Sequence, residues 1–503
     1  MDHLNRGNLH RLLQTTRRTC LSRRFSYALA RILLNAALVC LAIISIAPPS
    51  YAQSDRTKVK LVFSPPDQLQ VNISARHPIQ TWSFLNSYAG ATGMAERVHN
   101  FRDDSRGVEP AAARKIAAGV FRADHPLHAA IYEVKLSLGR SSDAAHVSWL
   151  TSDGGVLMLA DLLPMEIIQE GPLDASFDLP NGWEVSPLVP LSARLYSIED
   201  PMNAVWSVGP SLKSHSKTVG GTRLEVVVSG AWNFRIERAT EAAAKVFKKY
   251  VELTRFKLPS RSAVLIRPMP SLKGAETWQA QTRGSTLLLL IDQRADFKNW
   301  VGQLEVIFTH ELLHLWVPNA LNLKGDYDWF FEGFTLYQAL LTALDLKVIS
   351  FDEYLNTLGR VYDSYRAQPD RLSLTEASEQ RWTGAASTVY DKGMLLAFLY
   401  DLKLRAETRG ESELSDRYPE LFRKYASKTL NANEAIMSVL ISSPATEALL
   451  KSYVEGRGQM QLSETLKQHG IALETEGVHT YLKIAPNPTR DQLRVLKSLG
   501  YRQ

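Results

Sequence analysis

Two histidines four residues apart, His310 and His314, are the residues of this chain whose type and spacing most directly indicate chemistry. They lie in an apolar run, 300–316, with helical periodicity, and a helix places residues i and i+4 on one face. Both imidazoles can therefore reach one metal ion, while Glu311 projects beside the ion rather than at it. The alternative for this pattern alone is a buried helix with two hydrogen-bonded histidines.

A carboxylate further along the chain favours the metal site. Seventeen residues separate His314 from Glu332, which lies in a second helical run that reads Trp-Phe-Phe-Glu-Gly. An acid among aromatic side chains is costly to bury, and coordination of a metal offsets that cost. Two imidazoles and one carboxylate are ligands of catalytic zinc sites, which keep a fourth position open for water. We therefore predict one zinc ion per chain, held by His310, His314 and Glu332.

The first 52 residues have the pattern of a secretory signal peptide. They hold seven arginines and one acidic residue, then an apolar run at 32–47, then small residues at Ser50 and Ala52. We expect cleavage after Ala52, export to the periplasm or the medium, and no stable membrane insertion of the mature chain. The alternative is that segment 1–52 remains as an uncleaved anchor.

The rest of the chain carries equal numbers of basic and acidic residues, because the net charge of +6 arises entirely in the first segment. A neutral body provides no electrostatic footprint for nucleic acid, so we expect no nucleic-acid partner. Both cysteines, Cys20 and Cys40, also lie in the first segment. A metal site in the mature chain must therefore use His, Asp and Glu.

The elements that position these residues divide the chain into parts. Short alternating apolar runs, broken by Pro and Gly, predict an N-terminal β-sandwich domain at 53–232. From residue 233 the texture changes to a long helix-forming run, two apolar strands and then mainly helical periodicity. We predict a mainly α-helical catalytic domain at 233–455 and a short C-terminal tail at 456–503. The expected fold class is α+β.

Several motifs together resemble the gluzincin metallopeptidases, in which H-E-x-x-H precedes a glutamate ligand on the next helix. The stretch 314–319, His-Leu-Trp-Val-Pro-Asn, is similar to the H-x-W-F-G-N of alanyl-type aminopeptidases, and 329–333 is similar to their W-L-N-E-G. The spacing from His314 to Glu332 is one residue shorter than theirs. Tyr-Asp-Lys-Gly at 390–393 matches the Y-x-K-G motif of the clan.

Within that clan, the runs 373–378 and 394–402 most resemble the glycyl aminopeptidase family. The resemblance covers about residues 60–475 and implies a thermolysin-like catalytic domain after an N-terminal β domain. That family usually carries a C-terminal PDZ module. Only 33 residues follow Gly470, which is too few for such a module.

The resemblance implies His310, His314 and Glu332 as zinc ligands, Glu311 as general base and Tyr390 as the transition-state hydrogen-bond donor. Zinc lowers the pKa of a bound water, so a nearby carboxylate can take its proton at neutral pH. The oxyanion that develops needs a rigid donor such as a phenol. Outside this motif, a tyrosine at the start of a helix is more often a packing residue.

Asn319 and Asp328 are weaker candidates for orienting the ligand histidines, since such histidines usually donate their second N–H to a carboxylate or carbonyl. Both also fit ordinary loop or cap positions.

The strand motif that captures a substrate's amine in this clan departs from the pattern here. Its glutamate is expected just before 285–287, where the chain has Gln281. Glutamine cannot form an ion pair with a protonated amine. A carboxylate from the nearby Glu276 could substitute for it.

Three hypotheses follow. The first is an exported zinc metallopeptidase that hydrolyses peptides in an aminopeptidase-like manner with altered amine recognition. The second is a zinc endopeptidase on the same core, which the presence of Gln281 keeps open. The third is an inactive relative that binds peptides or a protein partner, against which the complete set of ligands, base and tyrosine argues. The sequence does not indicate an oligomeric state.

Overall fold

The structure of this chain is a computed structural model. It describes residues 56–104, 113–139, 144–187, 190–192, 195–270, 277–294, 300–368 and 372–502. The predicted signal peptide, 1–52, lies outside the described residues. None of the helices described is long and apolar enough to cross a membrane.

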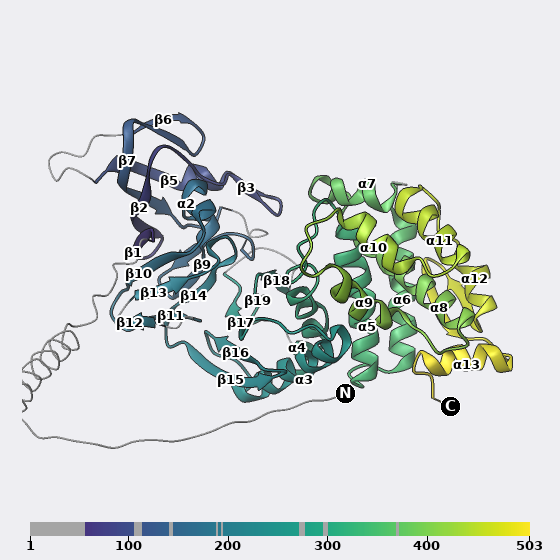
Figure 1. Cartoon of the computed structure of the whole chain (residues 1–503). Helices are drawn as coiled ribbons and strands as arrows, with labels where there is room; N and C mark the ends of the chain where they lie inside the picture. Colours follow the sequence, from purple (N-terminus) through teal and green to yellow (C-terminus); the bar gives the residue numbers. More distant parts are fainter. Residues whose placement is uncertain are drawn as a thin grey trace, which may run out of the picture. The chain divides into compact units, whose positions relative to one another are not determined.

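Two β-sheets build the N-terminal part (Figure 1). An eight-stranded sheet has the order β12-β13-β10-β1-β2-β7-β5, with β6 paired to β7, and a four-stranded sheet has the order β11-β14-β9-β8. Leu61 and Tyr132 from the first sheet share a core with Leu157 and Trp206 from the second. This packing confirms the predicted β-sandwich. The strands and the helix of this part are β1 (Lys58–Ser64), β2 (Gln68–Ser83), β5 (Val98–Asp103), β6 (Arg114–Ala117), β7 (Val120–Lys135), β8 (Trp149–Thr151), β9 (Gly154–Met158), α2 (Met165–Glu170), β10 (Leu173–Asp178), β11 (Trp183–Ser186), β12 (Pro190–Ser192), β13 (Leu195–Ile198) and β14 (Val205–Pro210).

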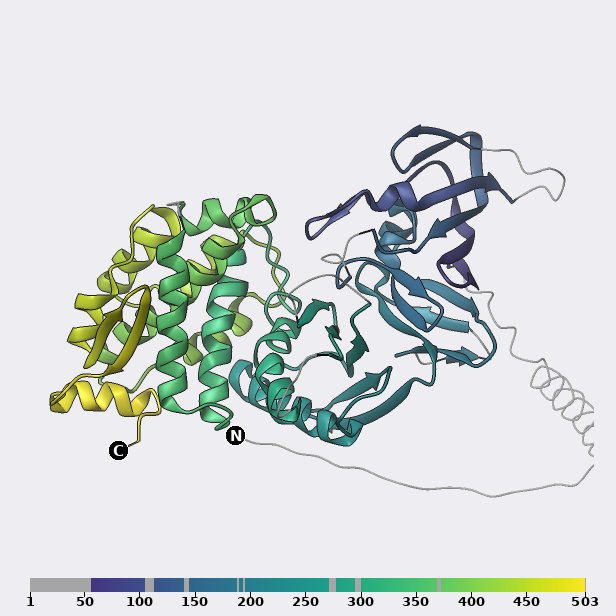
Figure 2. The ribbon, with the colours of Figure 1, turned by 180° about the vertical axis from the view of Figure 1, so that it is seen from behind.

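A small hairpin projects from the sandwich in Figures 1 and 2. Its strands are β3 (Ser87–Tyr88) and β4 (Ala91–Thr92), and Gly90 at the turn has a left-handed φ of 84°. A Cβ at Gly90 would lie 3.3 Å from the ring of Trp382. The hairpin tip is therefore in contact with the helical part of the chain.

A five-stranded mixed sheet follows the sandwich, in the order β15-β16-β17-β19-β18. The three central strands run parallel, and the two edge strands are antiparallel to their neighbours. β19 is buried along its whole length, as expected for a strand covered on both faces. The elements are β15 (Lys213–Val219), β16 (Thr222–Val228), α3 (Ile236–Thr254), β17 (Arg261–Pro268), β18 (Trp278–Arg283), β19 (Thr286–Ile291) and α4 (Trp300–Glu311).

The predicted boundary at residue 232 stays a prediction. The strands β15 and β16 lie before it, yet β16 pairs with β17 after it.

Helices and one two-stranded sheet, β20-β21, form the rest of the described chain, and this arrangement confirms the predicted α+β fold class. The central helix α8 (Gly393–Glu407) is buried on nearly all sides, which fits its continuous apolar sequence. The segment after residue 455 is folded onto the helices, and Leu466, Leu482 and Leu496 join the same core. The other elements are α5 (Thr335–Asp345), α6 (Phe351–Ala367), α7 (Leu374–Glu379), α9 (Arg417–Tyr425), α10 (Ala432–Leu440), α11 (Pro444–Leu450), α12 (Leu462–Gln468), β20 (Ile471–Glu476), β21 (His479–Ile484) and α13 (Arg490–Ser498).

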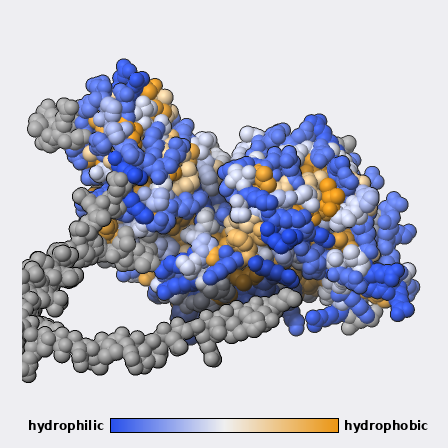
Figure 3. Space-filling view, viewed as in Figure 1, coloured by the Kyte–Doolittle hydropathy of each residue, from blue (hydrophilic) through white to orange (hydrophobic). Residues whose placement is uncertain are grey.

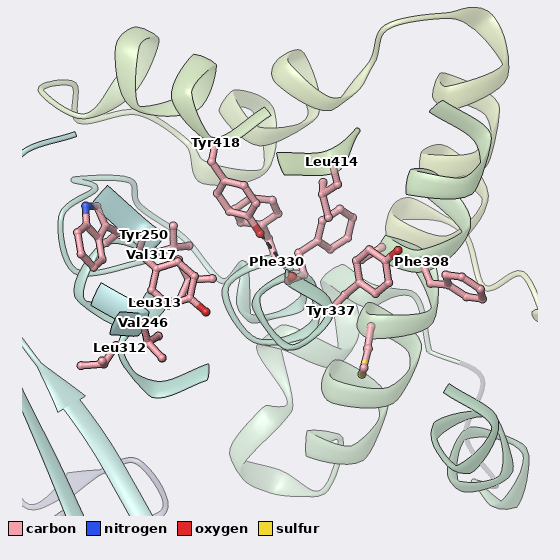
Figure 4. Packing of buried hydrophobic residues seen from close by; sticks show 14 of the residues in the cluster. Val246, Tyr250, Leu312, Leu313, Val317, Phe330, Tyr337, Phe398, Leu414 and Tyr418 are labelled. Carbon is pink, nitrogen blue, oxygen red and sulfur yellow. Dashed lines mark hydrogen bonds between the residues drawn. The ribbon is translucent and has the colours of Figure 1, made fainter. Parts of the chain in front are cut away.

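One apolar core joins the mixed sheet to the helices. Figure 4 shows Leu312 and Leu313, just after α4, near Val246 and Tyr250 of α3. The Tyr250 hydroxyl also donates to the backbone carbonyl of Thr309 in α4. In Figure 3 hydrophilic residues cover most of the visible face of the helical part, with smaller apolar areas between them. Buried packing against α3 thus fixes the position of the segment that carries the two histidines.

Candidate metal centre and active site

The side chains of His310, His314 and Glu332 converge. The two Nε2 atoms lie 3.1 Å apart, and Glu332 Oε2 lies 3.4 Å from Nε2 of His310 and 3.5 Å from Nε2 of His314. Ligand atoms at about 2.0–2.1 Å from a tetrahedral zinc ion lie about 3.3 Å apart. The three separations therefore fit ligands of one ion. Within the described part of the chain, these residues form the one cluster that could hold a metal.

The local backbone aims each ligand. His310 lies at the end of α4, His314 lies in the following 3₁₀ turn, and Glu332 lies in a π-helical turn, Trp329–Phe334, that runs into α5. His314 Nδ1 donates to the backbone carbonyl of Val317 across 2.9 Å, because a carbonyl can only accept. The lone pair of its Nε2 is then free to bind a metal.

The two sequence candidates for this orienting role make other hydrogen bonds. Asn319 Nδ2 donates to the backbone carbonyls of Thr282 and Gly284, and Asp328 accepts a hydrogen bond from Arg381. For His314 the partner of the second ring nitrogen is the Val317 carbonyl instead. A backbone partner has no signature in the sequence, so no pattern could have indicated it.

The surroundings of Glu332 favour the ionised form of its carboxyl group, which can bind a cation. Burial alone would raise the pKa of its carboxyl, but His314, His310 and Arg381 outweigh burial and hold that pKa well below its usual range. Its Oε2 is buried and has no hydrogen-bond partner among the described residues. A buried, unsatisfied carboxylate oxygen between two imidazole nitrogens fits a metal site.

Glu311 lies beside the three ligands. Its carboxylate Oε1 is 4.0 Å from Nε2 of His310, and the residue is 7% exposed. Burial raises the pKa of this carboxyl above its ordinary value, which makes the carboxylate a stronger base. The backbone carbonyl of Glu311 accepts a hydrogen bond from the Thr282 hydroxyl, which ties α4 to β18.

Tyr390 lies on a second π-helical turn, Thr388–Lys392, at the start of α8. Its hydroxyl accepts a hydrogen bond of 2.6 Å from Arg381, which also contacts Glu332 Oε1 at 2.8 Å. Burial raises the pKa of the Tyr390 phenol, so the group keeps its proton. Sequence reasoning missed Arg381, because no motif spacing links it to the ligands.

Gln281 lies on the edge strand β18 and lines the same cavity of about 520 Å³ as the groups above. Its Nε2 donates to the hydroxyl of Tyr88, across 3.3 Å, and Tyr88 comes from the β3–β4 hairpin of the sandwich. The Arg283 guanidinium lies 4.3 Å from the Tyr88 ring. Glu276, the possible substitute carboxylate, lies outside the described residues.

The described acids that line this cavity are Glu311, Asp328 and Glu332. Asp328 is paired with Arg381 at 2.7 Å. Two larger cavities, of about 750 and 1010 Å³, lie elsewhere in the structure. Among the described residues, neither is lined by a group of side chains that could hold a metal.

No family model matches the chain, and no curated protein matches it. Solved structures do match. An aminopeptidase N family protein from Idiomarina loihiensis matches with a TM-score of 0.72 at 17% identity, over 83% of this chain and 79% of its own. An M1 zinc metallopeptidase from Deinococcus radiodurans matches with a TM-score of 0.53 at 14% identity, over 81% of this chain and 94% of its own.

A mutant M1 zinc metallopeptidase from Deinococcus radiodurans, bound to a Tyr-Ser-Ala substrate, matches with a TM-score of 0.54 at 13% identity, over 81% of this chain and 94% of its own. These likenesses show that the chain has the fold of M1 zinc metallopeptidases, in which mixed sheets precede a helical region. This agrees with the resemblance to gluzincins.

Proposed function

We propose that this chain is an exported, zinc-dependent metallopeptidase that hydrolyses peptide bonds. The observation that carries the proposal is the convergence of His310, His314 and Glu332, with Glu311 and Tyr390 lining the same cavity. The fold shared with M1 zinc metallopeptidases, one of which binds a Tyr-Ser-Ala substrate, supports a peptide substrate. The predicted segment 1–52 would direct export, and the mature chain would begin at Gln53.

The side chains of the cavity divide the chemistry between them. A zinc ion held by the three ligands would acidify a water and polarise the scissile carbonyl. Glu311 takes the proton of the attacking water and passes it to the departing amine. Tyr390, which keeps its hydroxyl hydrogen, donates to the carbonyl oxygen as negative charge develops there.

The strand β18 is the binding edge for the peptide backbone in this proposal. It is the last strand in the order of the mixed sheet, and Gln281 projects from it into the cavity. An extended peptide can add to such an edge through main-chain hydrogen bonds. The substrate would then lie between β18 and the helix that carries Glu311.

Recognition of a free N-terminal amine is weak in this proposal. Gln281 provides an amide where a carboxylate is expected, and its amide nitrogen is already bound to Tyr88. The nearby Arg283 adds a positive charge beneath the Tyr88 ring. A hydrogen bond to a charged group contributes about 1.5–3 kcal/mol, so its loss reduces amine discrimination by about 10- to 150-fold. Because Gln281 replaces the carboxylate that would bind a free amine, endopeptidase activity is the second candidate function.

The test is hydrolysis of matched peptides with free and acetylated N-termini, with and without a zinc chelator. We expect chelator-sensitive cleavage of both, with less than about a tenfold preference for the free amine. Chelator-insensitive cleavage, or no cleavage, would contradict the proposed function and favour an inactive binding protein. A preference above about a hundredfold would show that amine capture persists by another route.

A pair of charge variants sharpens the test. Gln281→Glu should raise the preference for the free amine by about 10-fold or more, because it restores an ion pair. The control Gln468→Glu places the same charge on the exposed surface of α12, away from the residues that line the cavity, and should leave the preference unchanged. Sequencing the exported chain, with Gln53 expected first, tests the export step.

A further inference from the structure

Arg381 is the one arginine or lysine among the described residues that line the cavity. Its side chain is 10% exposed. We propose that Arg381 is a positioning residue with two tasks: it directs the hydroxyl hydrogen of Tyr390 toward the substrate, and it leaves Glu332 a single free oxygen for the metal. The inference rests on the function proposed above.

The first task follows from the donor inventory of the two groups. A guanidinium has only donors, so in its 2.6 Å contact with Arg381 the Tyr390 oxygen must accept. The single hydroxyl hydrogen of Tyr390 is then free to point elsewhere. The same Nη2 atom of Arg381 also contacts Glu332 Oε1 at 2.8 Å, so this carboxylate oxygen has a donor other than the phenol. The phenol is thereby kept available as a donor for a carbonyl oxygen.

The second task concerns the carboxylate of Glu332. Arg381 holds Oε1 at 2.8 Å, and Oε2 faces Nε2 of both histidines. One oxygen is thus engaged by the guanidinium while the other faces the metal position. Partners that hold a ligand in this way typically change metal affinity or activity by about 10- to 100-fold when they are removed.

Two further contacts fix the plane of the guanidinium. Asp328 accepts from Nη1 at 2.7 Å, and the ring of Trp382 lies 4.4 Å from the guanidinium carbon. The carboxylates of Asp328 and Glu332 both contact the Arg381 guanidinium, so they balance its charge and fix its orientation. A lysine ammonium is a point charge and cannot reproduce a planar fork with three oxygen partners.

The first experiment measures zinc affinity by competition with a chelator, which requires no turnover. We expect Arg381→Met to weaken zinc binding by about 10-fold or more, and Arg381→Lys to recover only part of that loss. The control is Arg457→Met, which removes an exposed arginine paired with Glu376 and should leave zinc affinity unchanged. Zinc affinity equal to wild type in both Arg381 variants, or full recovery in Arg381→Lys, would overturn the second task.

The second experiment is a double-mutant cycle with Tyr390→Phe at saturating zinc. If Arg381 acts through the phenol, Arg381→Met lowers kcat by about 10-fold or more in the wild type, with little change in KM. In the Tyr390→Phe background the same change should lower kcat by less than about threefold. Equal losses in both backgrounds would overturn the first task.

The outcomes separate this inference from the proposed function. An inactive wild type would reject the proposed function and, with it, the role toward Tyr390, while the zinc competition would still decide the role toward Glu332. An active wild type whose Arg381 variants match it in kcat and zinc affinity would reject only the inference. Thermal unfolding of each variant confirms that the comparison is between folded proteins, and Arg381→Lys preserves the buried charge if Arg381→Met does not fold.

Discussion

Gly333 and Gly393 meet backbone to backbone. A Cβ built on Gly333 would lie 2.5 Å from the Cα atom of Gly393, which is closer than real Cβ contacts. Gly333 directly follows the proposed ligand Glu332, and Gly393 lies three residues after Tyr390. The contact of these two glycines therefore sets how near the carboxylate and the phenol can come to each other.

Alanine at Gly333 should destabilise the protein, because its methyl group would meet a backbone that cannot move aside like a flexible side chain. We expect a loss of about 1–3 kcal/mol in the free energy of unfolding. Urea unfolding measures it. The control is Gly139→Ala, where a Cβ has no neighbour within 4 Å. Equal stability of the two variants would contradict the close approach.

Removal of His314 should abolish stoichiometric zinc binding. Its Nε2 is one of three converging ligand atoms, and its orientation is already set by the carbonyl of Val317. Metal analysis of the purified protein should find about one zinc per wild-type chain and close to none in His314→Ala. The exposed His479 provides a control, since His479→Ala should retain the metal. Zinc retained in full by His314→Ala would refute the ligand assignment.

The amide variant Glu311→Gln should keep zinc and the fold but lose turnover. Glu311 lies beside the ligands rather than among them, so its charge is needed for proton transfer and not for coordination. General-base catalysis contributes about 10²- to 10⁴-fold, and kcat should fall by that amount. Metal analysis checks that zinc is retained, and peptide kinetics checks that kcat falls. Loss of zinc in this variant would mean that the carboxylate is a ligand.

The buried Lys392 should make stability depend on pH in the alkaline range. Burial lowers the pKa of its ammonium group to about 8 in the folded chain, and its Nζ donates to the Leu372 carbonyl. Between pH 8 and the ordinary lysine value of about 10.4, the unfolded chain binds the proton more strongly, so stability rises with pH. Below pH 8 the folded state bears the full cost of burying the charge.

Lys392→Met removes this contribution. The free energy of unfolding of the variant minus that of the wild type should therefore be larger at pH 7 than at pH 10. The difference in the free energy of unfolding should change by about 2 kcal/mol over that range, after allowance for solvent screening. Urea unfolding at several pH values measures it, and parallel profiles for the two proteins would disprove it.

The sequence predicts best what depends on local periodicity. The i, i+4 spacing of His310 and His314 needs only a helix, and β19 needs only a short apolar run. The structure brings the predicted ligands, base and tyrosine together at one cavity, although their roles stay predictions. Short alternating apolar runs, broken by Pro and Gly, likewise sufficed to predict a β-sandwich.

What the sequence does not show is contact between distant segments. Tyr88 reaches Gln281 from a hairpin almost two hundred residues earlier, and its short strands have no periodicity that indicates this contact. Arg381 approaches Glu332 only when the turns that carry them pack together. Likewise, an apolar run indicates the strand β16 without revealing that its partner β17 lies after a helix.

The two π-helical turns that carry Glu332 and Tyr390 also constrain how this sequence can evolve. A π-turn accommodates one residue more than an α-helix with the same ends, and such turns occur often at functional sites. Deletion of one residue from 329–334 or 388–392 would restore α-helical winding and rotate the functional side chain by about 100°. Homologous chains should therefore keep the lengths of these turns fixed and vary in length instead between residues 320 and 326, where a one-residue change leaves both helices in phase.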